Sequence, residues 1–399
     1  MLTREWKYLL LITVTFIAAC IETDIYLPTF TDMMSYFSIS EREIQGLLTW
    51  NFIGICIAGP LYGPVSDAIG RKKPLLFALG LFFAGSVITM YAEDFTWMLV
   101  GRVLQGLGSG GCFTLGTAII FDAFKQEEAI VAIGRLNSIV PIIMAMAPIL
   151  GGYLNCMYGF RSNFLAIALV VLASLLICLL YLEETLPTER RAPFKLNEVM
   201  ANFRKVLTSV PFWQTTCVVS LVFAGYLAFL SAISVLFVIE FGVSKAYLPY
   251  FQASLLGAWV AASLGYKRAI ACFGKKSIKR AGTVLFLLGG AGFIATSYYA
   301  AENPYLLTLP MLFYSFGANW VQGLYFPEGM EIFPDIKGIA ASVLTSARLL
   351  ITACVVGVAS HFYDATIYPV MMVILAIVLV VYRTIASYEK RKRVTVCDT

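Results

Sequence analysis

The stretch Gly63-Pro64-Val65-Ser66-Asp67-Ala68-Ile69-Gly70-Arg71-Lys72-Lys73-Pro74 joins two long apolar runs, about Ile44–Leu61 and Pro74–Ala92. Its glycines permit a tight turn, and its cations enter a hydrocarbon layer only at high cost. Each flanking run approaches the roughly 20 residues that a helix needs to cross a bilayer. The stretch therefore predicts a short basic turn between two membrane-spanning helices.

The composition of the whole chain agrees with a membrane protein. Of its 399 residues, 59% are hydrophobic and 13% are charged, whereas soluble domains average roughly 45–50% and about 25%. The mean hydropathy is +0.81. These values exclude a soluble enzyme and a disordered chain. The apolar runs are continuous and do not alternate with polar residues, which argues against a membrane β-barrel.

Twelve apolar runs are long enough to cross a bilayer as helices. They are about Tyr8–Phe30, Ile44–Leu61, Pro74–Ala92, Trp97–Ile120, Ala129–Leu154, Asn163–Leu182, Phe212–Ile239, Tyr247–Tyr266, Ala281–Ala300, Pro304–Phe326, Gly338–Phe362 and Thr366–Ile385. The fold class is therefore an all-α integral membrane protein with twelve transmembrane helices.

The longest polar interval, Glu183–Val210, divides these spans into six and six. Apolar residues recur in it at helical spacing, from Phe194 to Val206, which predicts a short amphipathic helix on the membrane surface. We expect an N-terminal half over 1–182, a linker over 183–210, a C-terminal half over 211–386 and a basic tail over 387–399. The sequences Gly70-Arg71-Lys72-Lys73 and Gly274-Lys275-Lys276, 204 residues apart, form a weak repeat between the halves.

The basic residues predict the orientation of the chain. With twelve spans, 24 of the 29 Lys and Arg residues fall on the side of the two termini, three fall on the other side, and Arg102 and Arg348 fall inside spans. Because positive loops remain in the cytoplasm, both termini and the long linker are predicted to be cytoplasmic. The basic loops thus set topology and are not a nucleic-acid surface.

The loop at 63–74 resembles the signature loop of the major facilitator superfamily, Gly-x-x-x-Asp-x-x-Gly-Arg-Lys. The resemblance implies two six-helix halves with a binding site between them near the midplane. It also implies that Asp67 faces the N-terminal end of span eleven and latches the halves. Conformational gating would then involve Gly63, Asp67, Gly70 and Arg71. The alternative is an ordinary basic turn set by topology.

Two further motifs lie inside spans. Gly101-Arg102-Val103-Leu104-Gln105-Gly106-Leu107-Gly108 in span four resembles the family pattern Arg-x-x-Gln-Gly-x-Gly. Ala147-Pro148-Ile149-Leu150-Gly151-Gly152 in span five is similar to the antiporter motif, with Ala in place of the first Gly. The resemblance implies gating roles for Pro148, Gly151 and Gly152. The alternatives are an arginine that snorkels to the interface and an ordinary kinked helix.

Asp24-Ile25-Tyr26-Leu27-Pro28, together with Tyr62-Gly63-Pro64, resembles the bicyclomycin-resistance (Bcr/CflA) branch of the drug:proton antiporters. The resemblance covers about residues 20–165 and is thinner in the second half. It implies proton-coupled export of small molecules across the bacterial inner membrane by alternating access. The resemblance does not extend to the substrate, because members of the branch differ in it, and both siderophore export and drug resistance are expected candidates.

The depth of each charged residue in the first half follows from its position along its span. Asp24 lies about 16 residues, or roughly 24 Å, along span one, and Arg102 lies about 5 residues, or roughly 8 Å, from the outer end of span four. Asp24 and Arg102 are therefore expected to meet. Glu22 lies about 200° around the helix from Asp24, so both acids cannot face one partner equally. We favour Asp24 as the proton-coupling group, because the family motif contains it, with Glu22 as the alternative.

Arg348 lies about 10 residues, or roughly 15 Å, along span eleven. An arginine at this depth is predicted to face the substrate cavity and to attract an anion. The alternative is a structural pair with Glu328 or with a backbone carbonyl. Further candidates for the cavity lining are Trp50, Asn51, Tyr226, Asn319, Trp320 and Gln322.

Other functions receive little support. The single His, the scattered Cys residues and the absence of a phosphate loop argue against an enzyme, a metal site or a cofactor. The expected partners are a small-molecule substrate, protons and the lipid bilayer, and the protein is expected to be monomeric. The substrate is either a lipophilic or cationic drug, or an anionic metabolite such as a polycarboxylate siderophore or organic acid. The competing functions are a non-transporting receptor or scaffold and an uptake symporter for an organic anion.

The charge distribution gives a first testable prediction. A reporter that is active only in the cytoplasm should be active when fused after Thr399, because the terminal segments carry the basic excess. Activity of a periplasm-specific reporter at that position would contradict the predicted orientation.

Overall fold

The computed structural model describes residues 4–124, 126–191 and 196–397. Helices dominate this part of the chain, and no strand occurs in it. The chain divides into two compact units, Met1–Val199 and Met200–Thr399. Each unit is described by itself below.

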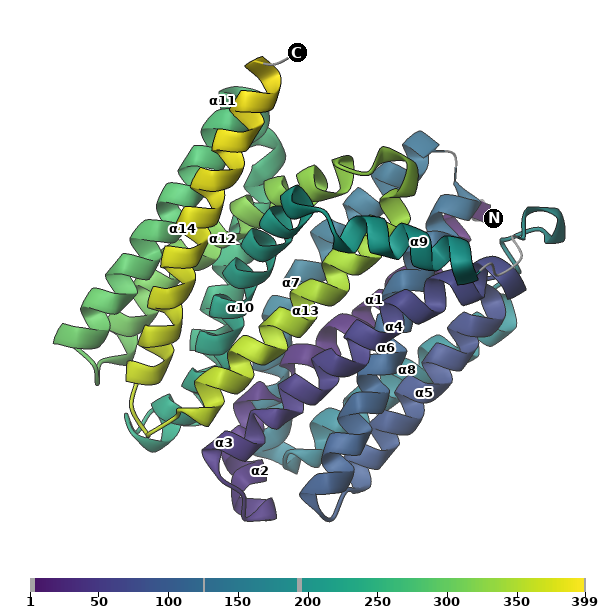
Figure 1. Cartoon of the computed structure of the whole chain (residues 1–399). Coiled ribbons are helices and arrows are strands. Elements are labelled where there is room, and N and C mark those ends of the chain that lie inside the picture. The colour runs from purple at the N-terminus through teal and green to yellow at the C-terminus, as the bar shows by residue number, and fades with distance from the viewer. Residues whose placement is uncertain (1–3, 125, 192–195, 398–399) are drawn as a thin grey trace. The chain divides into compact units, whose positions relative to one another are not determined.

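The first unit contains six long helices and several short ones (Figure 1). The long helices are α1 (Arg4–Asp24), α4 (Gly46–Ile69), α5 (Lys72–Tyr91), α6 (Phe95–Ala123), α7 (Gln126–Tyr158) and α8 (Arg161–Tyr181). The short helices are α2 (Phe30–Phe37) and α3 (Glu41–Ile44), with 3₁₀ turns at Leu27–Thr29 and Thr188–Arg190. Helix α6 packs against both α4 and α5, so it lies inside this unit.

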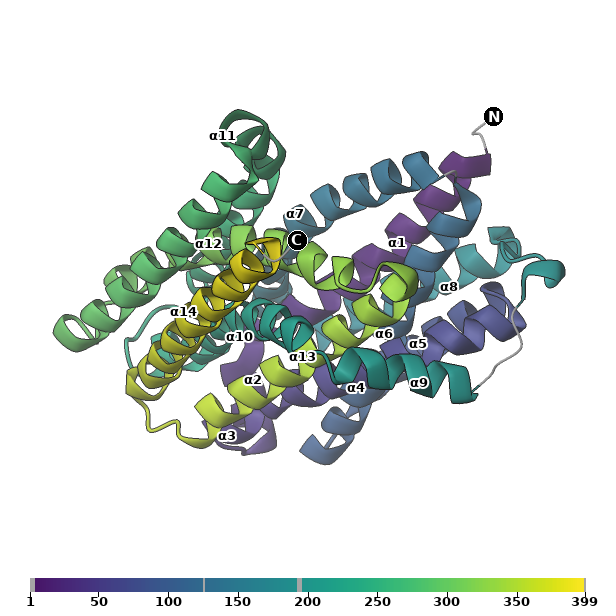
Figure 2. The ribbon, with the colours of Figure 1, turned by 45° about the horizontal axis from the view of Figure 1, so that its top comes forward.

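The boundary between the two units falls within the amphipathic helix α9 (Leu196–Leu207), so the second unit begins in that helix. Its long helices are α10 (Val210–Ile239), α11 (Leu248–Tyr299), α12 (Pro304–Glu331), α13 (Lys337–His361) and α14 (Tyr368–Cys397), with a 3₁₀ turn at Pro334–Ile336. Helices α11 and α12 lie side by side in both views (Figure 2). Helix α10 packs on α12, α13 and α14, and most of its residues are buried.

Each of the twelve expected spans lies on a helix. Within the described residues, nine helices are long and apolar enough to cross a membrane. One of them, α11, carries the expected spans eight and nine, which meet at the non-helical residue Gly274. Helix α9 occupies the segment expected to form a short amphipathic helix, although Phe194 lies outside the described residues.

The first expected span, Tyr8–Phe30, is wrong at its end. Helix α1 stops at Asp24, and the chain continues through the 3₁₀ turn at Leu27–Thr29. Pro28 accounts for the break, because proline lacks an N–H and its ring clashes with the preceding helical turn. Helix α1 therefore ends at an acidic residue, Asp24.

The sequence repeat at Gly70 and Gly274 is also a repeat of backbone conformation. Gly70 has φ 99° and ψ 169°, and Gly274 has φ 78° and ψ 155°. Both angles are in a region that residues with a side chain rarely adopt. The two glycines therefore form the same kind of sharp turn in each unit.

A close approach of helices holds the buried part of α6 in place. A Cβ atom at Gly106 would overlap the backbone carbonyl oxygen of Asn51 on α4. The absence of a side chain at Gly106 thus lets the two backbones touch, as small residues do in membrane helices. This contact fixes the depth and rotation of Arg102, one turn earlier on α6.

The turn glycine gives the second prediction. Gly70→Ala should lower the free energy of unfolding by about 1 kcal/mol or more, because an alanine is strained at positive φ. Its Cβ would also overlap the Glu184 carboxylate. Thermal unfolding of the purified protein in detergent measures the change.

Gly63→Ala is the matched control. Gly63 is helical, and a Cβ there meets no atom within 4 Å. We expect its stability to be unchanged or slightly raised, since alanine favours a helix. Equal losses for both variants would contradict the role assigned to the turn.

Candidate functional site

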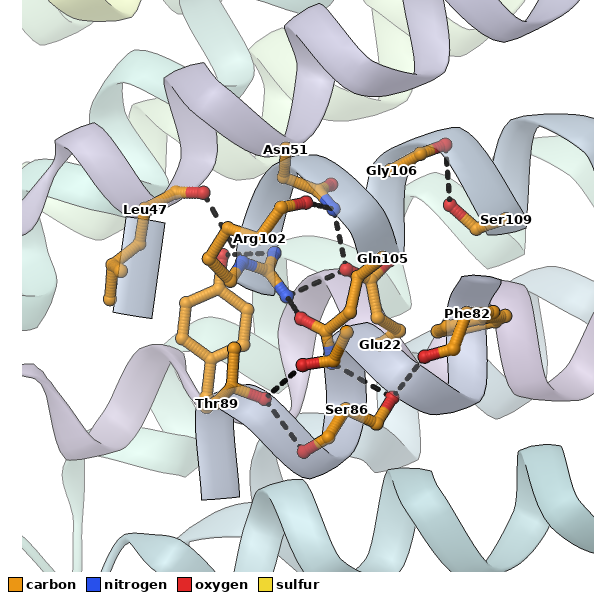
Figure 3. A network of polar contacts seen from close by, with 12 residues as sticks. Glu22, Leu47, Asn51, Phe82, Ser86, Thr89, Arg102, Gln105, Gly106 and Ser109 are labelled. Carbon is orange, nitrogen blue, oxygen red and sulfur yellow. Dashed lines mark hydrogen bonds and ion pairs between the residues drawn. The ribbon is translucent and has the colours of Figure 1, made fainter. Parts of the chain in front are cut away.

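A buried arginine organises the interior of the first unit. The Arg102 side chain is fully buried. Its Nε donates to the Leu47 carbonyl oxygen at 3.2 Å, and its Nη2 donates to the Tyr26 hydroxyl at 2.9 Å. Its Nη1 donates to Glu22 Oε1 at 2.6 Å and to Gln105 Oε1 at 2.7 Å. Every nitrogen of the guanidinium therefore has an acceptor, as Figure 3 shows for the labelled partners.

Glu22 supplies the opposite charge. Its side chain is fully buried, and Oε1 also accepts a hydrogen bond from Asn51 Nδ2 at 2.6 Å. The same Asn51 amide donates to the Arg102 carbonyl oxygen at 3.2 Å. Glu22 Oε2 is buried and has no hydrogen-bond partner. The ion pair thus bridges α1, α4 and α6 and leaves one carboxylate oxygen unsatisfied.

The network continues into α5. Gln105 Nε2 donates to the Ser86 hydroxyl at 3.0 Å, and that hydroxyl donates to the Phe82 carbonyl oxygen at 2.8 Å. The Thr89 hydroxyl donates to the Ser86 carbonyl oxygen at 2.9 Å. Such connected polar groups hold one another in a single arrangement. Four helices therefore fix the orientation of Arg102 (Figure 3).

The expected pairing of Asp24 with Arg102 is wrong in this conformation, because Glu22 takes that place. The two acids point to different sides of α1, as their separation of about 200° requires. Asp24 is 1% exposed, and its Oδ2 has no hydrogen-bond partner. Among the described residues, no ion pair reaches Asp24. The unit therefore buries one paired and one unpaired acid within three residues.

The motif on α7 packs next to Asp24. A Cβ atom at Gly151 would overlap the carbonyl oxygen of Ile25, the residue after Asp24. Asn163 Nδ2 on α8 donates to the same carbonyl oxygen at 3.3 Å. Pro148 and Gly152 are both buried. Gly151, one of the residues expected to gate the conformation, thus packs on the chain at the break after α1.

The signature turn forms a separate charge cluster. Arg71 Nη1 lies 2.6 Å from Asp67 Oδ1, and Arg71 Nε lies 2.8 Å from Asp122 Oδ2. Arg71 Nη1 also donates to the Ser66 hydroxyl at 2.5 Å. The Asp67 side chain is 55% exposed. The latch role of Asp67 stays a prediction.

Glu184, which sequence reasoning missed, supports this turn. Its Oε1 accepts from the backbone N–H of Arg71 at 2.7 Å, and its Oε2 accepts from that of Lys72 at 3.3 Å. The N–H groups of Thr185 and Leu186 also donate to Oε1. Burial opposes ionisation of Glu184, but these four donors outweigh it and hold its pKa below the usual range. Its stabilising contribution is therefore present above the usual glutamate pKa and is lost as pH falls through the lowered pKa.

A cluster of charges also lies at one end of the second unit. Lys279 Nζ is 2.9 Å from Glu328 Oε2 and 2.6 Å from Glu389 Oε1. Lys392 Nζ is 3.5 Å from Glu328 Oε1. Glu328 is therefore engaged elsewhere, and the alternative that it pairs with Arg348 is wrong.

The Arg348 guanidinium instead packs against an aromatic ring. Its guanidinium carbon lies 5.0 Å from the centroid of the Phe223 ring on α10. Its Nε is buried and has no hydrogen-bond partner. Within the described residues, Arg348 makes no salt bridge. This arginine differs in that respect from Arg102.

The other candidate residues have varied surroundings. Asn51 belongs to the Glu22–Arg102 network, and the Trp320 indole N–H donates to the Ala262 carbonyl oxygen at 3.0 Å. Tyr226 is 3% exposed and Trp50 is 44% exposed. Asn319 is partly buried, and Gln322 Oε1 is buried without a hydrogen-bond partner. In the described part of the chain, no group of three or more His, Cys, Asp or Glu residues lies where it could hold a metal ion.

Comparison with known proteins gives the family. Residues 12–356 match the model of the Major Facilitator Superfamily. Multidrug resistance protein MdtL of Escherichia coli (strain K12) is 27% identical over 326 residues, which is 82% of this chain and 81% of that protein. MdtL of Shigella boydii gives the same values.

Solved structures share the fold. The D-xylose-proton symporter superposes with a TM-score of 0.73 at 16% identity, covering 95% of this chain and 97% of that chain. The human organic anion transporter MFSD10 superposes with a TM-score of 0.67 at 18% identity, covering 95% of this chain and 100% of that chain. At these identities the likeness concerns the fold alone.

The two acids on α1 give the third prediction. Glu22→Gln should lower the free energy of unfolding by about 3 kcal/mol or more, because it leaves the buried Arg102 without a counter-charge. Asp24→Asn keeps the side-chain volume and breaks no hydrogen bond, so its loss should stay below about 1 kcal/mol. Thermal unfolding in detergent compares the two variants. A loss for Asp24→Asn as large as that for Glu22→Gln would refute the assigned pairing.

Proposed function

Because the chain belongs to the major facilitator superfamily, we propose that it is a proton-driven exporter of small organic molecules that works by alternating access. It is a multi-pass membrane transporter and not an enzyme. We place it in the bacterial inner membrane with both termini in the cytoplasm, and in the bicyclomycin-resistance branch of the drug:proton antiporters. The excess of Lys and Arg on the side of the two termini supports this assignment, as do the motifs at Asp24, Arg102 and Pro148.

The observation that carries the proposal is the unequal burial environment of Glu22 and Asp24. Arg102 and Asn51 neutralise and solvate Glu22. Asp24 is equally buried, but no ion pair reaches it from the residues that the structure describes. An unpaired carboxylate charge in a membrane interior is expensive, and taking up a proton removes that charge. We therefore assign proton loading to Asp24 and not to Glu22.

Release of the proton needs a second conformation. The Tyr26 hydroxyl already accepts a hydrogen bond from Arg102, so the segment that follows Asp24 contacts the same cation. A rotation of the break after α1 that brings Asp24 to Arg102 would favour the ionised carboxylate and release its proton. Gly151 on α7 packs on Ile25, so movement of α7 would accompany that rotation. The conformational change is then coupled to release of the proton from Asp24.

The direction of transport rests on two supports. The Pro148–Gly152 stretch resembles the antiporter motif, and the relative MdtL is named as a multidrug resistance protein. We propose export of a drug-like molecule or of an anionic metabolite, such as a polycarboxylate siderophore. Uptake of an organic anion by proton symport is the second candidate. Arg348 supports this candidate, because a guanidinium whose buried Nε has no acceptor attracts an anion. A receptor or scaffold would give no proton flux.

The fourth prediction tests coupling in inverted membrane vesicles that are energised to an acidic interior. In a screen of cationic, neutral and anionic compounds, at least one should dissipate the pH gradient through the wild-type protein. Asp24→Asn should abolish both this proton flux and uphill accumulation of the same compound, because an amide carries no proton. Equilibrium binding of that compound should remain within about threefold, since the change is nearly isosteric.

Asp94→Asn is the matched control for this experiment. Asp94 caps helix α6 through a hydrogen bond from the Trp97 N–H at 3.1 Å. Asparagine caps helices about as well as aspartate. Coupling should therefore survive in this variant. If Asp24→Asn still concentrates the compound under a proton gradient, Asp24 is not the carrier, and Glu22 becomes the next group to test.

A further inference from the structure

The second unit contains a cation and an aromatic cluster that the coupling proposal does not use. Arg348 is the twelfth residue of α13, about 16 Å from its start at 1.5 Å per residue. In the described residues of this unit, the acids lie in loops or near helix ends, and Glu328 and Glu389 are paired with Lys279. Among the described residues of this unit, Arg348 therefore has no partner of opposite sign at its own depth.

Three rings form a continuous apolar wall next to Arg348, which we call the aromatic platform. It comprises Phe223 and Tyr226 on α10 and Trp259 on α11. Phe223 and Trp259 have ring centroids 6.0 Å apart, Tyr226 and Trp259 are 5.3 Å apart, and Phe223 and Tyr226 are 6.3 Å apart. Phe223 and Trp259 are partly exposed, so the platform is not fully covered.

The geometry of Arg348 leaves hydrogen-bonding capacity for a ligand. A guanidinium has five N–H donors in one plane. The ring of Phe223 interacts with the cation 5.0 Å away but accepts none of these in-plane hydrogen bonds. The buried Nε has no acceptor. An unpaired buried donor on a charged group is costly, and a carboxylate satisfies two such donors at once.

Arg102 cannot serve in this way. Each of its nitrogens already donates to Leu47, Glu22, Gln105 or Tyr26, and the side chain is fully buried. The two intramembrane arginines therefore have different tasks. Arg102 neutralises an acid of the protein itself, whereas Arg348 forms no salt bridge with any acid that the structure describes.

We propose that Arg348 and the aromatic platform form a subsite for an organic anion with a flat apolar body. The carboxylate binds the guanidinium edge, and the apolar body packs on the partly exposed rings of Trp259 and Phe223, with Tyr226 buried behind them. A cation is disfavoured here by repulsion from Arg348. This inference rests on the proposed transport function and deepens it, since it selects the anionic class of substrate over the cationic class.

The test measures equilibrium binding to the purified full-length protein in detergent at pH 7 by calorimetry, without any proton gradient. The probes share one ring system and differ in charge: 1-naphthoate, 1-naphthamide and 1-naphthylmethylammonium. The wild type should bind naphthoate about tenfold or more tightly than the amide, as a charge-assisted hydrogen bond implies, and the ammonium compound more weakly still. No binding of naphthoate up to about 1 mM, or no preference for it over the other two probes, overturns the proposal.

Arg348→Gln should weaken naphthoate about tenfold or more and leave naphthamide nearly unchanged. Trp259→Leu should weaken both by a similar factor of roughly three or more, because it removes ring contact and no charge. The exposed Arg383→Gln is the control for total charge and should alter neither. Unchanged naphthoate affinity in Arg348→Gln overturns the subsite.

If Arg348→Gln does not fold, Arg348→Lys takes its place. Lysine retains the charge but lacks the planar guanidinium with its paired N–H donors. The preference for naphthoate over naphthamide should therefore shrink without vanishing. An undiminished preference would count against bidentate binding. The binding measurement uses no proton gradient, so failure of the subsite and failure of proton coupling are separate results.

Discussion

The ion pair of Arg102 and Glu22 is the interaction on which the arrangement of the first unit depends. It places two full charges in an interior where neither has access to water, with 2.6 Å between Nη1 and Oε1. Such a pair is tolerable only when its remaining donors and acceptors are satisfied. The Leu47 carbonyl, the Tyr26 hydroxyl and the amides of Asn51 and Gln105 meet most of that demand from α4, from α6 and from the segment after α1, and Glu22 Oε2 has no hydrogen-bond partner. The close approach of α4 and α6 at Gly106 brings Asn51 within reach of both Glu22 and the Arg102 carbonyl.

The break after α1 gives Asp24 its separate environment. Asp24 lies about 200° from Glu22 around α1 and is the last residue of that helix. Because the helix stops at Asp24, the following residues Ile25 and Tyr26 are free to contact α7 and Arg102 respectively. One acid is thus fixed by a cation, while the other lies at a junction between rigid helices. Protonation changes are more readily linked to movement at such a junction than inside a helix.

The sequence predicted the helices well because membrane spans follow from local hydrophobicity alone. It predicted the intramembrane charges as functional candidates for the same reason, since each is too costly to be accidental. It did not predict which acid meets Arg102, because that depends on helix rotation and on the break at Pro28. Glu184 was also missed: an acid in a polar interval looks like a solvated charge, and only the fold brings it to the N–H groups of Arg71 and Lys72.

The cost of an unsatisfied charge also distinguishes the two units. At the helix ends, Arg71 and Lys279 each pair with two acids, so both of these cations have counter-charges. Deeper in the helices, Arg102 is balanced by Glu22, whereas Arg348 is only stacked on Phe223. A cation–π contact recovers part of the cost of burying a cation, and much less than a buried ion pair with its hydrogen bonds. The residual cost at Arg348 is therefore a source of binding energy for an anion, and it is present before any ligand arrives.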